Sequence, residues 1–277
     1  MHSTLRPALA ALALCACASA HAQKAGDDVV SLGWFHIMPQ QSSQPLTTHV
    51  APTPINTPLR LPSSFTSSGT GLASNKADTL GLVFSHFLTD NIAITSVAGV
   101  PPTFKIYGHG TIKPPGPAGA LGSQDIGQAG VNPIVKSVRQ WSPALLFQYY
   151  FASSTSKFRP FIGVGVSYNF FTNLELNPNF VQSTQQNLGA ILAAGAGKPG
   201  QTRVEAKASS SWAPVFNAGA VYNINEHWGV TASVTYIPLK TTSSVIIKAA
   251  DGTQLAVTQS ELKADPIITY LALSYRF

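Results

Sequence analysis

Histidine, serine and acidic side chains could catalyse a reaction, but their spacing in this chain does not assemble a catalytic site. The candidate bases beyond residue 22 are His36, His49, His86, His109 and His227. Ser85 directly precedes His86, but neighbours in an extended strand point to opposite faces, so they cannot act as nucleophile and base. No carboxylate completes that pair convincingly, and the sequence contains no HExxH motif and no Gly-rich phosphate loop after a strand. We therefore expect no enzyme activity, no metal site and no cofactor.

Both cysteines, Cys15 and Cys17, fall within an N-terminal segment that resembles an export signal. Arg6 precedes the apolar run 9–18, and Ala20-His21-Ala22 fits a small-x-small cleavage site. We predict a cleaved signal peptide at residues 1–22 and one mature domain at residues 23–277, without disulfides or thiol chemistry. A buried N-terminal helix and a lipoprotein signal around Cys15 are the alternatives.

The composition points to a surface that is solvated by something other than water. The 277 residues are 44% hydrophobic and only 10% charged, whereas an ordinary soluble domain is about 25% charged. Beyond the N-terminus there is no run of about 18 apolar residues that could form a transmembrane helix. Only helices and closed barrels satisfy every backbone group in lipid, so a β-barrel remains. The formal charge is +6, but the cations are scattered, which disfavours a nucleic-acid partner.

The elements that must position any site are strands, because apolar and polar residues alternate with a period of two. The alternation predicts strands at 29–38, 79–88, 92–107, 139–152, 158–170, 209–223, 228–236 and 267–277. Short turns at 89–91, 153–157 and 224–227 alternate with long connections. This plan is typical of an all-β, eight-stranded antiparallel up-and-down transmembrane barrel with long extracellular loops in the bacterial outer membrane. A soluble β-sandwich is the alternative.

Several segments resemble the OmpW/AlkL family of outer-membrane β-barrel proteins. The similar segments are Thr89-Asp90-Asn91-Ile92, the run from Ser156 through Lys157-Phe158-Arg159-Pro160 to Gly165, Tyr236-Ile237, and Asp265-Pro266 with the terminal Tyr275-Arg276-Phe277. The resemblance implies a barrel whose narrow, largely apolar lumen passes small hydrophobic molecules across the outer membrane. The chain departs from the family in its longer loops and at Thr235, where a relative carries an inward Trp near the constriction.

The alternation also predicts which side chains line the lumen. An eight-stranded barrel is only wide enough to hold its own side chains, so any passage is narrow. Apolar lining favours a hydrophobic solute, although the same side chains could simply plug the barrel. The predicted substrate-binding side chains are Phe35, Val83, Phe87, Val97, Leu146, Phe161, Thr235, Ile237 and Ile268.

Three prolines mark a weak place in the predicted wall. Pro101 and Pro102 fall in the third predicted strand and Pro143 in the fourth, all toward the outer side. Proline has no N–H to donate to a ladder. We predict a lateral seam there, through which an apolar solute leaves sideways into lipid. The alternative is that these prolines end the paired region above the membrane.

Charged and terminal residues suggest partners in the envelope. Arg159 is predicted inward near the periplasmic end, with Glu226, Asp90, Asp27 and Asp28 as candidate partners. Four cations near the outer strand ends could pair with lipopolysaccharide phosphates or remain solvated: Lys105, Arg139, Arg203 and Lys240. The terminal Phe277 suits recognition by the barrel assembly machinery, and a closed barrel without edges favours a monomer. Besides uptake of hydrophobic solutes, a structural or surface-recognition barrel that binds through its loops remains open.

Overall fold

A closed barrel of eight antiparallel strands forms one half of the molecule, as predicted. The computed structural model describes residues 23–277, and the predicted signal peptide at 1–22 lies outside them. The barrel strands are β1 (Asp28–Met38), β6 (Ala77–Phe87), β7 (Ile92–Gly99), β12 (Ala144–Tyr150), β13 (Phe158–Leu176), β15 (Ser211–Asn223), β16 (Trp228–Tyr236) and β19 (Ile267–Arg276). The ring closes because β1 pairs with both β6 and β19, while β12 pairs with both β7 and β13. No helix among residues 23–277 is long and apolar enough to span a membrane.

The barrel wall has an apolar outer face because side chains alternate across each strand. In β12, Leu145 is 52% exposed on the outside, whereas Leu146 is 2% exposed on the inside. Exposed Leu32, Phe147 and Val164 extend the apolar outer face around other strands. A band of this kind suits lipid, where no water competes for the wall.

The third and fourth predicted strands are each split in two, which corrects the sequence-based ranges 92–107 and 139–152. The first gives β7 and β8 (Thr103–His109), and the second gives β11 (Val135–Trp141) and β12. The breaks fall at Pro101, Pro102 and Pro143. The physical reason is that proline cannot continue the backbone ladder.

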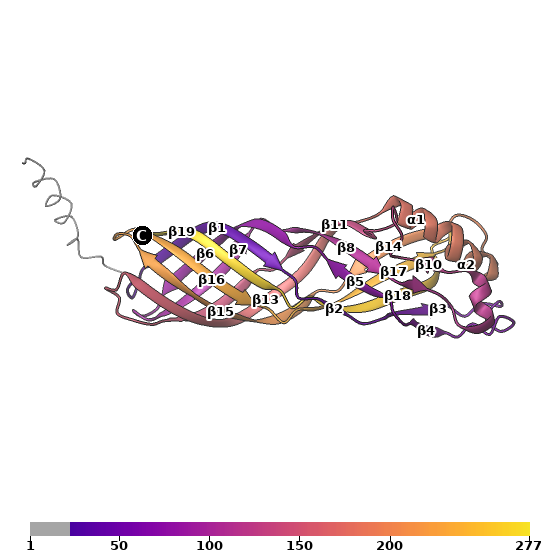
Figure 1. Cartoon of the computed structure of the whole chain (residues 1–277), viewed down its shortest axis with the longest axis horizontal. Helices are drawn as coiled ribbons and strands as arrows, with labels where there is room; N and C mark the ends of the chain where they lie inside the picture. The colour runs from indigo at the N-terminus through magenta and orange to yellow at the C-terminus, as the bar shows by residue number, and fades with distance from the viewer. Residues whose placement is uncertain (1–22) are drawn as a thin grey trace, which may run out of the picture.

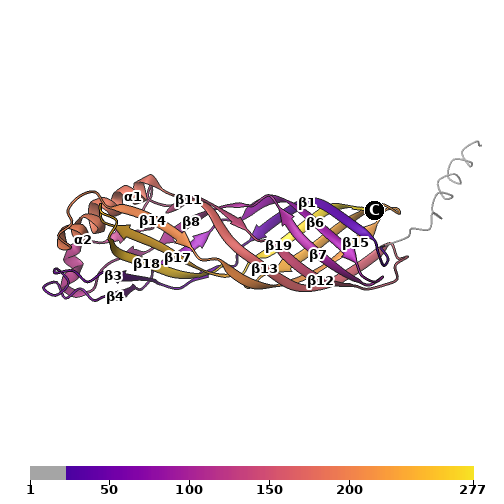
Figure 2. The ribbon, with the colours of Figure 1, turned by 180° about the vertical axis from the view of Figure 1, so that it is seen from behind.

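Beyond the barrel, the long connections are ordered as a second layer of structure, here called the extension (Figures 1 and 2). One sheet contains β3 (Leu46–Val50), β4 (Ser64–Ser67), β14 (Arg203–Ala208), β17 (Lys240–Lys248) and β18 (Gln254–Lys263), with β2 (Ser42–Ser43) pairing on β18. The other joins β5 (Gly71–Ser74), β8 and β11 to the end of β13, and β9 (Thr111–Ile112) pairs with β10 (Gln124–Asp125). The helical segments are η1 (Gly116–Leu121), α1 (Pro178–Thr184), η2 (Gln185–Gly189) and α2 (Ala190–Gly195).

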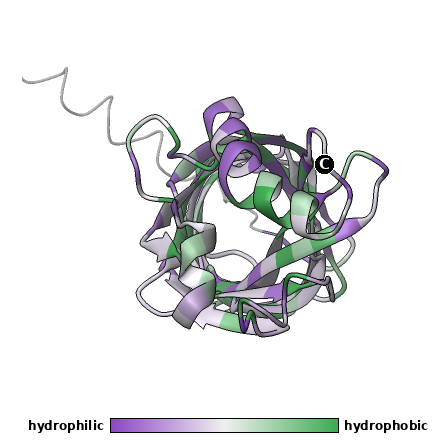
Figure 3. Ribbon diagram, turned by 90° about the vertical axis from the view of Figure 1, so that its right-hand side faces the viewer, coloured by the Kyte–Doolittle hydropathy of each residue, from purple (hydrophilic) through white to green (hydrophobic). Residues whose placement is uncertain are grey.

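The extension has its own apolar core, which explains why these polar-looking connections fold. Phe104, Ile126, Phe180, Leu192 and Leu255 are buried together there. Figure 3 looks along the molecule onto this end, where the helices lie over the ring of strands. The opposite end, here called the turn end, carries the three short turns and the C-terminus (Figure 1).

An ion pair on the surface links the segment after α2 to the β17–β18 hairpin, and its small contribution to the stability of the extension depends on pH. Lys198 Nζ lies 2.6 Å from Asp251 Oδ2. Hydrogen bonds from Lys198 and from Thr253 hold the pKa of Asp251 at about 2, below its usual 3.8. A lowered pKa stabilises the folded state above pH 3.8, and this contribution disappears as the pH falls through about 2.

We therefore expect the side-chain carboxyl carbon of Asp251 to titrate with a midpoint near pH 2 in the folded barrel, and closer to the usual 3.8 in Lys198→Met, which lacks the main hydrogen-bond donor. NMR of the folded barrel in detergent micelles measures the titration. Asp251→Asn cannot titrate, so comparison with its spectrum identifies the resonance. An unchanged midpoint in Lys198→Met would show that Lys198 does not lower the pKa of Asp251.

Candidate functional site

A cavity of about 430 Å³ lies inside the barrel. It is lined by all nine side chains that sequence analysis placed in the lumen: Phe35, Val83, Phe87, Val97, Leu146, Phe161, Thr235, Ile237 and Ile268. The three prolines Pro101, Pro102 and Pro143 line it as well. The structure thus brings the predicted residues together around one space, and their role in binding a solute stays a prediction.

The upper part of the cavity, toward the extension, is apolar. Leu146, Val215 and Ile237 form a buried cluster there, and Val97 and Ile268 pack against it. On the β1 side, the rings of Phe35 and Tyr270 stack with their centroids 4.3 Å apart. We call this part of the cavity the apolar chamber.

The middle of the cavity carries a row of uncharged polar side chains that sequence analysis did not identify, apart from Thr235. This row, here called the polar belt, consists of Ser85, Thr95, Gln148, Asn217 and Thr235. Strand register aligns it, because Ser85 faces Thr95 and Asn217 faces Thr235 as cross-strand partners. The available sequence signal was a polar residue at one inward position in several successive strands.

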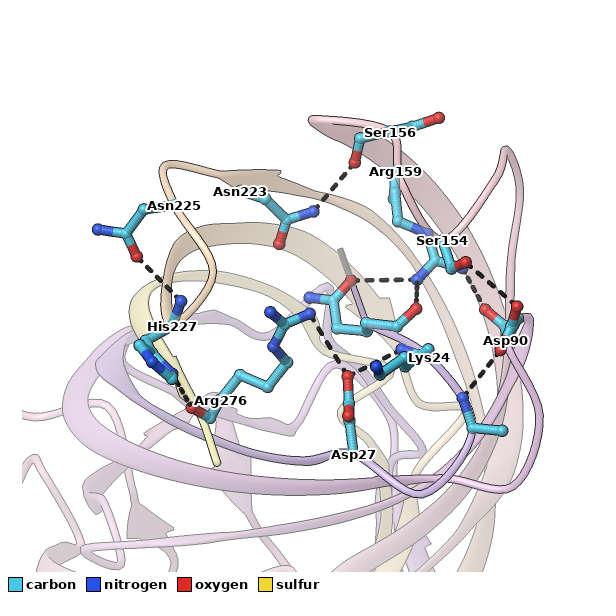
Figure 4. Close-up of polar contacts among 12 residues, drawn as sticks. Lys24, Asp27, Asp90, Ser154, Ser156, Arg159, Asn223, Asn225, His227 and Arg276 are labelled. Atoms are coloured by element: carbon cyan, nitrogen blue, oxygen red, sulfur yellow. Dashed lines mark hydrogen bonds and ion pairs between the residues drawn. The ribbon is translucent and has the colours of Figure 1, made fainter. Parts of the chain in front are cut away.

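The floor of the cavity, at the turn end, is an aromatic cluster around a buried arginine. Phe87, Tyr150 and Phe161 pack together, and the guanidinium carbon of Arg159 lies 5.3 Å from the centre of the Tyr150 ring. Arg159 has 0% exposure. It donates to the main-chain oxygen of Gln23 at 2.7 Å and to that of Asp90 (Figure 4).

Sequence analysis sought a carboxylate partner for Arg159, but both strong acceptors are backbone carbonyls. Asp90 does lie beside Arg159, yet it offers its main-chain oxygen. Asp27 instead pairs with Arg276, with Nη1 and Oδ2 3.4 Å apart (Figure 4). Backbone carbonyls carry no charge to signal their role, which is why residue types could not reveal this contact.

The N-terminal segment closes the floor because several hydrogen bonds fix it across the turn end. The Ala25 N–H donates to Asp90 Oδ1 at 2.9 Å, and the Gly26 N–H donates to the carbonyl of Phe87 at 2.8 Å. The Ala25 N–H, followed by the hydroxyl of Ser154, lowers the pKa of Asp90. The cavity therefore ends on Gln23, which is 4% exposed.

The wall of the cavity is interrupted between β7 and β12. Backbone pairing runs up to Val97 and Ala144, and it resumes above at Thr103 and Arg139. Between them, no hydrogen bond of the described backbone joins residues 98–101 to residues 141–143. At the end of β7, a side chain at Gly99 would meet a backbone oxygen at 2.5 Å, so the strand ends on a residue without one. We call this interruption the seam.

The prolines interrupt the wall and do not end it, because β8 and β11 continue the pairing beyond them. Pro102 still accepts from the Gln140 N–H at 3.1 Å, and Pro143 accepts from the Tyr168 N–H of β13 at 3.1 Å. Since both sides of the seam line the cavity, the apolar chamber reaches the wall at this point.

The structure separates Ser85 from His86, as the strand alternation predicts. Ser85 is buried and bonds Thr95 inside the barrel, while His86 lies on the other face with its Nδ1 2.8 Å from Asp28 Oδ1. Asp28 is a carboxylate partner that sequence analysis did not assign to His86. Within residues 23–277, no group of three or more His, Cys, Asp or Glu side chains could hold a metal ion.

A second, smaller cavity of about 90 Å³ lies in the extension. It is apolar, with Ile106, Ile126, Val138 and Phe171 among its lining side chains. The four predicted lipopolysaccharide contacts, Lys105, Arg139, Arg203 and Lys240, are exposed on the extension.

Comparison with known proteins gives consistent matches to this architecture. The model of the OmpW family matches residues 43–277. Outer membrane protein W of Vibrio cholerae is 28% identical over 269 residues, which cover 97% of each chain. Outer membrane protein AlkL of Ectopseudomonas oleovorans is 26% identical over 200 residues, which cover 72% of this chain and 66% of AlkL. The crystal structure of the outer membrane protein OprG from Pseudomonas aeruginosa matches the fold with a TM-score of 0.67, at 22% identity, over 93% of this chain and 99% of OprG.

Proposed function

The chain belongs to the OmpW family of bacterial outer-membrane barrels, and from this premise we propose that it is a channel for passive uptake of small hydrophobic molecules. The observation that carries the proposal is the chemistry of the cavity. None of its lining residues is Asp, Glu, Lys, Arg or His. A polar or ionic solute would lose its hydration without gaining a charged partner, whereas an apolar solute gains burial. The resemblance to AlkL-type proteins points to the same class of solute.

We propose that the solute leaves sideways through the seam between β7 and β12. The floor supports this route, because buried Arg159 and the N-terminal segment block the axial path to the turn end. The seam supports it as well, because the backbone there lacks cross-strand pairs and the apolar chamber extends to it. Outside the seam lies the lipid-facing surface, where an apolar molecule is more stable than in the aqueous periplasm.

Uptake of an alkane tests the proposal. We expect outer-membrane vesicles that contain the barrel to take up a medium-length alkane faster than matched vesicles without it, by about tenfold, which corresponds to a barrier lowered by about 1.4 kcal/mol. Uptake of a sugar of similar size should not change. Equal alkane uptake in both preparations, with the barrel shown to be folded, would contradict the channel function.

A surface-recognition function through the extension is a second candidate. The ordered core of the extension favours it, since a rigid platform loses little entropy on binding. Four exposed cations would contact lipopolysaccharide phosphates: Lys105, Arg139, Arg203 and Lys240.

We also propose that the barrel assembly machinery recognises the terminal Phe277 and that the closed barrel is a monomer.

A further inference from the structure

One main-chain oxygen fixes the direction of the hydrogen bonds in the polar belt. The Asn217 amide nitrogen donates to the Val234 carbonyl at 3.2 Å, and a carbonyl can only accept. The Asn217 oxygen therefore faces Gln148 and accepts from its amide nitrogen at 2.9 Å. Gln148 in turn directs its own oxygen at the hydroxyls of Thr95 and Tyr150, which donate to it at 2.6 and 3.1 Å.

These directions leave unused donors in the belt. The Gln148 amide nitrogen carries two protons and donates one of them to the Asn217 side-chain oxygen. Thr235 accepts from Asn217 at 2.8 Å, so its own proton has no acceptor among the described residues. Thr95 gives its proton to Gln148 and therefore accepts from Ser85 at 2.8 Å. Since Gln148 and Thr235 both line the cavity, the belt presents two donors to whatever occupies it.

The surroundings of these donors exclude a charged partner. No Asp, Glu, Lys, Arg or His side chain lines the cavity. The nearest cation is Arg159 in the floor, which does not line the cavity and whose amino groups already donate to the carbonyls of Gln23 and Asp90. A buried carboxylate without a cation would be strongly destabilised.

We propose that the channel prefers medium-length apolar molecules that carry one uncharged hydrogen-bond acceptor, such as an ester or ketone carbonyl, at one end. The carbonyl accepts from Gln148 and Thr235 in the polar belt, and the chain lies in the apolar chamber beside Val97, Leu146 and Ile237. Its far end then points toward the seam. This inference rests on the proposed function, because it names the solute class of the same cavity.

Three ligands with the same number of non-hydrogen atoms test the inference: methyl octanoate, nonanoate, which is the conjugate base of the isomeric acid, and an unbranched alkane. Each is titrated against a fluorescent hydrophobic probe bound to the full barrel in lipid nanodiscs. For the unmodified protein we expect displacement by the ester at a lower concentration than by the alkane, and little displacement by nonanoate. Displacement by nonanoate or by the alkane at a concentration as low as that of the ester would overturn the inference.

Two variants identify the donors. Valine has nearly the same shape as threonine, and in Thr235→Val the Asn217 amide keeps its hydrogen bond to the Val234 carbonyl. We expect ester binding to weaken by about fivefold in this variant, because one neutral hydrogen bond to the ligand is lost. Gln148→Met should weaken ester binding by about tenfold, because the donor and its alignment are both lost. Alkane binding should stay within about twofold of the unmodified protein in both variants, since dispersion contacts are kept.

Thr269→Val is the matched control, because Thr269 is a cross-strand partner of Val234 and does not line the cavity. It should bind the ester and the alkane like the unmodified protein. Equal losses of ester and alkane binding in Thr235→Val would overturn the preference for an acceptor while leaving the channel intact. If neither the ester nor the alkane displaces the probe from the unmodified, folded barrel, the proposed function itself fails.

Discussion

Ala144→Trp should remove most of the accelerated alkane uptake. Ala144 faces inward at the lower rim of the seam, opposite Val97, and it lines the cavity. An indole there would fill the passage between the apolar chamber and the wall. We expect about nine-tenths of the gain over barrel-free vesicles to disappear, because an eight-stranded barrel leaves no second route around such a side chain.

Leu145→Trp is the control for this variant. Leu145 follows directly in β12 but points outward and is 52% exposed. Tryptophan is well tolerated on the outer face of a membrane barrel, so uptake should stay at the unmodified rate. Loss of uptake in both variants would indicate damage to the strand, and unchanged uptake in Ala144→Trp would show that solute does not pass the seam.

Arg159→Ala should make the floor leak without slowing apolar uptake. The substitution removes a buried side chain and leaves the carbonyls of Gln23 and Asp90 without their donor. We expect a loss of about 3 kcal/mol in the free energy of unfolding, together with water in the vacated space. Planar-bilayer recordings should then show a larger ion conductance than recordings of the unmodified barrel.

The uptake rate of this variant distinguishes the two exit routes. If solute leaves through the seam, the alkane rate stays near that of the unmodified protein while the leak appears. An alkane rate that rises together with the conductance would instead favour exit through the floor. Lys157→Ala, which removes an exposed cation from a turn at the same end, should change neither quantity.

The strands could be predicted because their signal is local. Successive side chains of a strand point to opposite faces, so Leu145 and Phe147 fall outside and Leu146 inside, and the nine cavity-lining positions followed from the same rule. The missing N–H of proline is local too, and it located the seam. What alternation could not show was that Pro101 and Pro143 divide each strand in two, because pairing beyond a break depends on a neighbour.

The contacts that give the site its chemistry needed the closed barrel. Gln148 and Asn217 are 69 positions apart, and Gln23 and Arg159 are 136 apart, yet each pair lies within hydrogen-bonding distance. The order of the extension arises in the same way, because β3 and β18 meet across most of the chain. The face of a strand on which each residue lies depends on neighbouring backbone angles, so it can be read from the amino-acid order alone. The residues that share a height inside the barrel depend on strand register and ring closure, so they become visible only in the folded protein.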